Sequence, residues 1–92
     1  MNGYRYKAAP KFWRNYKKLT PAQKQSVKTT WQIFKRDPFD PRLGTHKIHR
    51  LSAAYGKTVY SVVIEDDLRV VFFLDQNIVY TVDVGSHDIY RG

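Results

Sequence analysis

The chain has 92 residues, with 16 Lys and Arg, 8 Asp and Glu, and no cysteine. That length makes one small domain over residues 1–92, and without cysteine neither a disulfide framework nor a thiolate metal site is available. No apolar run approaches the roughly 20 residues of a membrane span and the N-terminus lacks the apolar core of a signal peptide, so we expect a soluble, cytoplasmic protein.

The first elements that the sequence predicts are a short strand and a helix. Residues 4–8 alternate between cationic side chains and aromatic or apolar ones, the pattern of an edge strand whose charges face water. Pro10 suits the first turn of a helix over residues 11–19. The apolar positions of this helix lie at i, i+4 and i+7 and form one stripe that should pack on a sheet: Phe12, Tyr16 and Leu19.

A second helix is predicted from Thr20 to about Arg36. Thr is a favourable N-cap, and Pro21 fits the first helical position behind it. Because only a short turn separates the two helices, they should form an antiparallel hairpin on one face of a sheet. The side chains of the second buried stripe are Val27, Trp31, Ile33 and Phe34.

Residues 37–44 hold two prolines and one glycine and are predicted to be a loop within the same domain. Residues 46–51, with the sequence HKIHRL, resemble a short strand rich in cationic side chains. His46 and His49 would then point to opposite faces, because side chains alternate along a strand, and only one of them would reach a given site.

Residues 58–91 are predicted to form three antiparallel strands and a polar tail. Three β-branched and aromatic runs are separated by loops at residues 65–67 and 75–77. If both loops have three residues, the residues that pair on one face are all apolar. A second loop of two residues would instead put Thr81 and Asp83 among the core residues, so burial of apolar side chains favours loops of three residues. The predicted pairs are Ile64–Leu68, Val62–Val70 and Tyr60–Phe72 in the first hairpin, and Leu74–Ile78, Phe72–Tyr80, Val70–Val82 and Leu68–Val84 in the second.

The same register puts Arg69 opposite Asp83 on the other face of the sheet, near the polar tail. This pair is either a surface ion pair, worth on the order of 0–1 kcal/mol, or the floor of an anion site.

The tail, residues 85–91, contains an imidazole, a carboxylate, a phenol and a guanidinium. The sequence therefore predicts an α+β fold, in which an N-terminal strand and an antiparallel helical hairpin accompany a small, mainly antiparallel sheet. Any chemistry should lie at the tail.

The charge is unevenly distributed along the chain. Residues 1–50 hold 13 Lys and Arg against Asp37 and Asp40, a net charge of +11, whereas residues 51–92 carry −3. A basic half with interspersed aromatic residues suggests a polyanionic partner such as nucleic acid, although the solvated face of a basic protein has the same composition. The side chains predicted to contact RNA are Lys17, Lys18, Lys24, Lys28, Lys47 and Arg50.

The predicted arrangement of two helices over a meander resembles the RelE/ParE toxin superfamily of bacterial toxin–antitoxin systems. The segments that carry the resemblance are FWRNYKKL in the first helix, LRVVF on the middle strand and VDVGSHDIYR at the end. The resemblance covers nearly the whole chain. It is strongest to YafQ-like, or plasmid-stabilisation, members, which have a Gly-x-His-Asp ending and a histidine-containing strand after the loop. It implies a RelE-like fold and neither cofactor nor metal. It also implies a cognate antitoxin protein as partner, with an extended, acidic antitoxin segment that neutralises an apolar groove of the toxin. RelE-like members cleave mRNA on the ribosome, whereas ParE-like members poison DNA gyrase without cutting anything.

The resemblance also implies roles for individual residues. Arg69 matches the arginine that contacts the scissile phosphate, His87 matches the catalytic residue after the last strand, and Tyr90 matches a tyrosine near the C-terminus. The two strand lysines of RelE itself fall on Ser61 and Val63 here. The resemblance therefore implies that His46 or His49 supplies the missing cationic or basic function.

Cleavage of RNA without a metal ion needs a base for the 2′-OH proton, a cation for the charge on the phosphorane, and an acid for the 5′-oxygen. Histidine can serve either proton-transfer role because its unperturbed pKa is about 6.5, and the planar fork of arginine donates two parallel hydrogen bonds to a phosphate. We therefore expect His87 to act as acid or base and Arg69 to clamp the phosphate. Asp88 or Asp83 would orient these groups, and Tyr90 would stack on a base or bond a phosphate oxygen.

Other interpretations stay open at this stage. A gyrase poison would share the fold without needing an acid–base pair, and a catalytically inert member would only bind the antitoxin. A zinc site built from the three histidines has poor ligand spacing and no evident carboxylate support. The aromatic residues assigned to the core or to an antitoxin-binding face, rather than to base stacking, are Tyr4, Tyr6, Trp13 and Trp31. Arg69, His87 and Tyr90 together, with the basic half, favour an endoribonuclease that acts on the ribosome and its mRNA.

Overall fold

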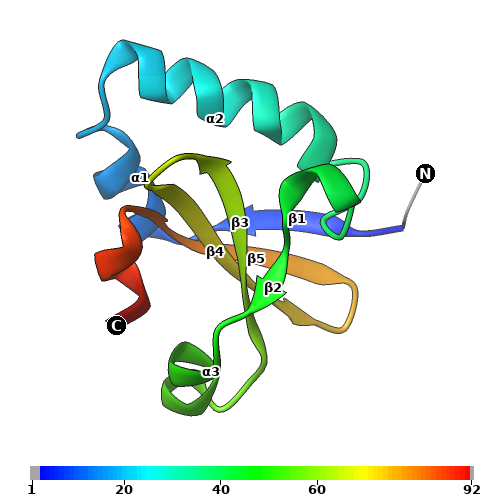
Figure 1. The fold of residues 1–92 in the computed structure, drawn as a ribbon. Coiled ribbons are helices and arrows are strands. Elements are labelled where there is room, and N and C mark those ends of the chain that lie inside the picture. Colours follow the sequence, from blue (N-terminus) through cyan, green and yellow to red (C-terminus); the bar gives the residue numbers. More distant parts are fainter. Residues whose placement is uncertain (1–2, 92) are drawn as a thin grey trace.

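The computed structural model describes residues 3–91, and of His87 and Arg91 it describes the backbone alone. Five strands form one sheet in the spatial order β1-β5-β4-β3-β2. Helices α1 and α2 pack on one face, and α3 and the 3₁₀ helix η2 pack on the other (Figure 1). The elements are β1 (Arg5–Ala8), α1 (Pro10–Tyr16), α2 (Pro21–Phe34), η1 (Pro41–Leu43), β2 (His46–Lys47), α3 (His49–Tyr55), β3 (Val59–Glu65), β4 (Leu68–Asp75), β5 (Ile78–Gly85) and η2 (His87–Arg91). The predicted α+β fold, with its N-terminal strand, helical hairpin and mainly antiparallel sheet, is confirmed.

The N-terminal strand and the helical hairpin form largely as predicted. β1 lies at an edge of the sheet and pairs with β5 in parallel. α2 begins behind Thr20 in a capping box: the Thr20 hydroxyl accepts from the Gln23 N–H, and the Gln23 side chain accepts from the Thr20 N–H. α1 ends at Tyr16, one turn earlier than predicted, but Leu19 still packs against the core. None of the helices in residues 3–91 has the length and apolarity that crossing a membrane requires.

The segment after the loop differs from the strand predicted over residues 46–51. Only His46 and Lys47 pair with β3, and the chain enters α3 at His49. Ile48 and Leu51 are one helical turn apart and pack in the same apolar cluster against the sheet, which favours the helix. The two histidines therefore lie on different elements rather than on alternate faces of one strand.

The turn of the second hairpin is shorter than predicted. Gln76 adopts the left-handed conformation, with a φ of 57°, and Asp75 pairs directly with Ile78, so the turn has two residues. The four pairs predicted for this hairpin are therefore wrong. In the first hairpin the pairs Val62–Val70 and Tyr60–Phe72 are confirmed, but Leu68 pairs with Glu65 instead of Ile64.

A β-bulge in β5 restores an apolar pairing farther along the hairpin. The register shifts beyond the pair of Phe72 and Thr81, so that Val71 lies opposite Asp83 and Val82 is the extra residue. Val70 then pairs with Val84, and Arg69 lies opposite Gly85. The predicted pairing of Arg69 with Asp83 is wrong, because the shorter turn and the bulge together move each strand residue past its expected partner.

Apolar side chains fill both faces of the sheet. On the side of α1 and α2 the sheet contributes Val62, Val70, Phe72 and Val79, which pack against Phe12, Val27 and Phe34. On the other side Val59, Val71 and Val82 pack against Leu51 of α3 and against Ile89 and Tyr90 of η2. We call this second side the tail face.

Candidate functional site

A short hydrogen bond attaches the C-terminal segment to the tail face. The Ser61 Oγ and Tyr90 Oη atoms lie 2.6 Å apart, and Ser61 is fully buried, with 0% of its surface exposed. Ile89 packs so closely over Gly85 that a Cβ on Gly85 would lie 2.8 Å from the Ile89 Cγ2 atom. Gly85, the first residue of the tail, is therefore required by this close approach. The hydrogen bond to Ser61 fixes the phenol of Tyr90 against β3.

His46 lies beside this contact. It is paired with Ser61 across the β2–β3 ladder, and opposing residues of an antiparallel pair project from the same face. The His46 Nδ1 atom is 2.9 Å from the Gly44 carbonyl oxygen, and because a carbonyl only accepts, Nδ1 carries the proton. The Nε2 atom of this exposed imidazole is then the ring nitrogen without a hydrogen in the neutral form.

Arg69 lies on the same face one step toward the β3–β4 turn. Arg69 is two residues from Val71, which packs against η2, so both side chains project from the same face of the sheet. It pairs with Val63 of β3 and with Gly85 of β5. Its Nη1 atom donates to the carbonyl oxygens of Glu65 at 2.7 Å and Leu68 at 3.2 Å. The Nη1 group of the half-buried guanidinium thus bonds the carbonyl oxygens of the β3–β4 turn. The other N–H groups of the guanidinium could contact a phosphate.

Asp83 does not face the candidate site. Its side chain is buried, with 4% of the residue exposed, and Oδ1 accepts from the Asn15 Nδ2 at 2.6 Å and from the Val84 N–H at 2.8 Å. Oδ2 lies 3.5 Å from the Lys11 Nζ atom. The carboxylate therefore holds α1 to β5, and among the side chains that the structure describes it has no contact with Arg69 or with the tail.

The remaining tail residues follow Gly85 directly. His87 begins η2, but its side chain lies outside the described residues. Asp88 is exposed, and its backbone N–H donates to the Ser86 Oγ at 3.3 Å. The backbone of His87 is thus two residues beyond the pair of Gly85 and Arg69.

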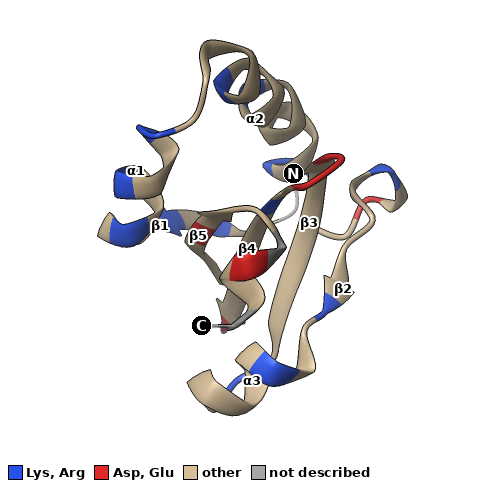
Figure 2. Ribbon diagram, turned by 60° about the vertical axis from the view of Figure 1, so that its left-hand side comes forward, with Lys and Arg blue, Asp and Glu red and all other residues tan. Residues whose placement is uncertain are grey.

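The other predicted side chains do not form one surface with these residues. His49 is exposed at the start of α3. Lysines and arginines are found on α1, α2 and β1, and separately on β2 and α3 (Figure 2). Lys17, Lys18, Lys24 and Lys28 belong to the helical hairpin or its turn, whereas Lys47 and Arg50 belong to β2 and α3. The residues predicted to contact RNA therefore fall into two groups, because α2 and α3 lie on opposite sides of the sheet.

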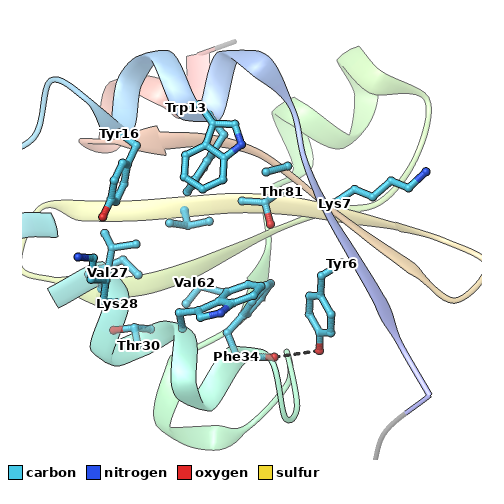
Figure 3. A pocket seen from close by; sticks show the side chains of 15 residues that line it. Tyr6, Lys7, Trp13, Tyr16, Val27, Lys28, Thr30, Phe34, Val62 and Thr81 are labelled. Carbon is cyan, nitrogen blue, oxygen red and sulfur yellow. Dashed lines mark hydrogen bonds between the residues drawn. The ribbon is translucent and has the colours of Figure 1, made fainter. Parts of the chain in front are cut away.

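An apolar cleft of about 450 Å³ opens between α1, α2 and the sheet (Figure 3). Val27 of α2 and Val62 of β3 line it, and Trp13 of α1 projects into it. Trp31, expected in the buried stripe of the second helix, lines the cleft and is 38% exposed. Each of the two helices thus contributes one tryptophan to the cleft.

No protein-family model matches the sequence, and no curated protein sequence matches it. Among the residues that the structure describes, no three His, Asp or Glu side chains are grouped as ligands for a metal ion.

Solved structures with the same fold are more informative. YafQ from Escherichia coli strain BL21(DE3) matches with a TM-score of 0.69 at 16% sequence identity, over 97% of this chain and 99% of that one. The archaeal RelE–RelB complex from Pyrococcus horikoshii OT3 matches with a TM-score of 0.69 at 15% identity, over 100% of this chain and 98% of that one. The E. coli DinJ–YafQ complex matches with a TM-score of 0.64 at 16% identity, over 97% and 99%. The chain therefore has the fold of the RelE and YafQ toxins over nearly its whole length.

Proposed function

We propose that the chain is the toxin of a type II toxin–antitoxin pair and a metal-independent, ribosome-dependent endoribonuclease. The observation that carries the proposal is the arrangement on the tail face, where Arg69 and His46 project from the sheet beside the phenol of Tyr90 and the start of η2. The shared fold with RelE and YafQ supports it. An antitoxin partner is supported by the RelE–RelB and DinJ–YafQ complexes, and the chain would act in the cytoplasm, where ribosomes and mRNA are found.

The proposed reaction is an in-line attack of the ribose 2′-oxygen on the neighbouring phosphorus. The base removes the 2′-OH proton, the O2′–P bond forms, and the P–O5′ bond breaks as the acid protonates the 5′-oxygen. The products are a 2′,3′-cyclic phosphate and a 5′-OH. His46 and His87 would share the two proton transfers, because imidazole exists in both protonation states near neutral pH.

Arg69 would stabilise the negative charge on the equatorial phosphate oxygens. The guanidinium has five N–H donors in a fixed plane, and Nη1 is directed at the turn carbonyls. The Nη2 end would meet the phosphate, while the turn holds the plane in position. Preorganised donors of this kind contribute more to catalysis than mobile ones, because they need no reorientation when the charge develops.

Tyr90 would contribute by position rather than by proton transfer. Its hydroxyl is 2.6 Å from the buried Ser61 Oγ, so its ring is fixed where a base or ribose of the substrate could pack against it. Asp88, which is exposed beside His87, would orient the imidazole. His49 is a weaker candidate than His46 for the second proton-transfer group, since it lies on α3 and not on β2, where His46 is opposite Ser61.

The proposal is tested by inducible expression of the wild type, His87→Ala and the control Gln32→Ala, a change on the exposed side of α2, followed by mapping of mRNA 5′ ends. We expect codon-phased cuts with the wild type and the control, and their loss with His87→Ala. Growth arrest with DNA-damage signalling and no cuts would favour a gyrase poison instead. No toxicity from any of the three would indicate an inert, antitoxin-binding member.

A further inference from the structure

Three aromatic side chains form a row on the tail face, farther along the sheet than the proposed proton-transfer groups. We call Tyr55 of α3, Phe73 of β4 and Tyr80 of β5 the aromatic row. The two-residue turn of the second hairpin places Phe73 directly opposite Tyr80, and their rings stack with centroids 5.1 Å apart and planes 25° apart. The ring of Tyr55 lies 6.3 Å from that of Phe73. Residues from three elements that are distant in the sequence thus form one aromatic surface.

The aromatic row is accessible to solvent. Tyr55 is 39% exposed, and Phe73 and Tyr80 are half-buried. Phe73 packs in the apolar cluster of the tail face and lies between the other two rings. Tyr55 and Tyr80 therefore form the two ends of the row, and another planar group could stack on them.

A lysine accompanies the row at its β5 end. Lys7 pairs with Tyr80 across the parallel β1–β5 ladder. Its neighbours Tyr6 and Ala8 pack on the side of α1 and α2, so Lys7 projects from the tail face. Lys7 also borders the apolar cleft, but its ammonium group points away from the cleft in Figure 3. The exposed cation is thus beside the last ring of the row.

A second lysine lies at the other end of the row. The Lys57 Nζ atom is 5.1 Å from the centre of the Phe73 ring, within the range of a cation–π contact. It is also 3.9 Å from the Asp75 carboxylate, but these side chains are 44% and 53% exposed. A pair this exposed contributes little free energy, so Lys57 can exchange the carboxylate for a phosphate at small cost.

The row continues from the proposed cleavage site. Arg69 and Phe73 are four residues apart on β4 and project from the same face, so their Cα atoms lie about 13 Å apart. Tyr90 packs in the same apolar cluster as Phe73. An RNA strand with one phosphate bound to Arg69 would therefore pass Tyr90 and reach the row within a few nucleotides.

We propose that the aromatic row stacks bases of a single-stranded RNA on one side of the cleaved bond, while Lys7 and Lys57 contact its phosphates. Aromatic rings beside cations bind single strands with little preference for sequence, because every base has a face that stacks. The inference rests on the proposed function in taking this RNA to be the mRNA substrate. It gives Tyr55 and Tyr80 a role in positioning the strand and none in proton transfer.

A protein surface is the competing occupant, since aromatic side chains are also enriched in protein interfaces. Two features favour RNA. Lysine is depleted in protein interfaces, yet here Lys57 lies over one ring of the row and Lys7 is paired with another. The row also lies on the face that carries Arg69 and His46, so a strand bound at the proposed cleavage site would reach it.

The test measures binding of the purified full chain, without ribosomes, to a fluorescent single-stranded RNA of about 12 nucleotides with 2′-O-methyl riboses. This probe lacks the 2′-OH and cannot undergo the proposed cleavage. We expect Tyr55→Leu and Tyr80→Leu to weaken binding about fivefold or more, because each removes a stacking face. Tyr80→Phe retains the ring and should bind like the wild type. The matched control is Phe39→Leu, which removes a ring that is 38% exposed and packs on Tyr60 instead of on the row.

Two further measurements separate stacking from the general attraction of RNA to a basic protein. The ring protons of Tyr55 and Tyr80 should shift upfield in NMR spectra when the RNA is added, because a stacked base shields them. Lys57→Gln should reduce the slope of log Kd against log salt concentration by about 0.7, the value for one phosphate contact on a single strand. Arg14→Gln, an exposed change on α1 across the sheet, should leave the slope unchanged.

Three results would overturn the inference. One is absence of saturable binding by the wild type, or equal weakening by Tyr80→Leu and Phe39→Leu. Another is binding without an upfield shift of the ring protons, which would leave only electrostatic attraction. The third is dimerisation of the wild type in sedimentation experiments that Tyr80→Leu abolishes, which would make the row an interface between two copies of the chain.

The two proposals can fail separately. A wild type that binds the uncleavable RNA as expected but leaves ribosome-bound mRNA intact would contradict the nuclease activity alone. A wild type that cleaves mRNA, with Tyr55→Leu and Tyr80→Leu binding the RNA normally, would contradict the role of the aromatic row alone.

Discussion

The hydrogen bond between Ser61 and Tyr90 connects the middle of the sheet to the C-terminal segment. Tyr90→Phe removes the phenolic hydroxyl and leaves the fully buried Ser61 Oγ without this partner, so we expect a loss of about 1–3 kcal/mol in the free energy of unfolding. Ser61→Ala should cost about 1 kcal/mol. Urea denaturation of both variants and of the double variant measures the coupling between the two side chains. Strictly additive losses would contradict a direct bond.

The two histidines near the start of α3 should differ in their effect on activity. His46 is opposite Ser61 on the tail face, whereas His49 begins α3 away from that contact. We expect His46→Ala to lower the cleavage rate by about 10²–10⁴-fold, the usual contribution of a general acid or base. His49→Ala is its matched control and should cleave near the wild-type rate. Initial rates of mRNA cleavage on purified ribosomes measure both, and the reverse order would show that His49 reaches the site.

At the scale of elements, the buried carboxylate of Asp83 fixes α1 against β5. Asp83→Ala would leave the Asn15 amide and the Val84 N–H without their acceptor, at a cost of about 1.5–3 kcal/mol in the free energy of unfolding. Asp83→Asn retains an acceptor oxygen and should cost less. Urea denaturation gives the two values, and amide hydrogen exchange in α1 should be faster with Asp83→Ala. Equal stability of the two variants would mean that the acceptor oxygen is not what holds the helix.

The loop before β2 has a feature that responds to acid. Hydrogen bonds from the Arg42 guanidinium and backbone N–H hold the pKa of Asp40 at about 2, below its usual value of 3.8. Because the folded-state pKa is lowered, the stabilisation is present above pH 3.8 and is lost as the pH falls toward 2. We expect Arg42→Ala to raise the pKa of Asp40 toward 3.8, as measured by NMR titration of its carboxyl carbon. An unchanged midpoint would exclude Arg42 as the cause.

Local patterns predicted most of the elements but not their exact register. Thr20 and Pro21 marked the start of α2, and alternating β-branched residues marked β3 to β5. The left-handed residue of the second hairpin is Gln76, although Asn77 was the better candidate by propensity. α3 was missed because seven residues with one buried side chain, Leu51, give too short a pattern to distinguish a helix from a strand.

At the scale of the whole molecule, what the sequence could not predict is what depends on distant contacts. Asp83 was placed on an open face because its partner Asn15 is 68 positions away in the chain, and a buried carboxylate is acceptable only once such partners are known. The cleft arises from the spacing between the hairpin and the sheet, which no local pattern encodes. The placement of Arg69 on the side of the sheet away from the helical hairpin did follow from strand alternation, even though its predicted partner was wrong. Strand alternation left open which of His46 and His49 lies on that side.

The central feature of the molecule is that the two sides of its sheet carry different sites. The tail face holds Arg69, His46 and Tyr90 for the proposed cleavage, and the side of the sheet that α1 and α2 cover holds the apolar cleft. Since the sheet separates the two sites, a substitution in the cleft should leave the cleavage activity intact. The variant Trp13→Ala should therefore cleave mRNA at the wild-type rate, and a large loss of cleavage would contradict the separation.

The most direct test of the proposed function is the chemistry of the RNA ends that the purified protein produces on ribosome-bound mRNA. Attack by the 2′-oxygen leaves a 5′-OH and a 2′,3′-cyclic phosphate, whereas a metal-activated water would leave a 5′-phosphate. We predict 5′-OH ends that are ligated only after treatment with a kinase and that disappear with His87→Ala. Ends bearing a 5′-phosphate, or cuts that persist in His87→Ala, would contradict a metal-independent acid–base mechanism centred on the tail.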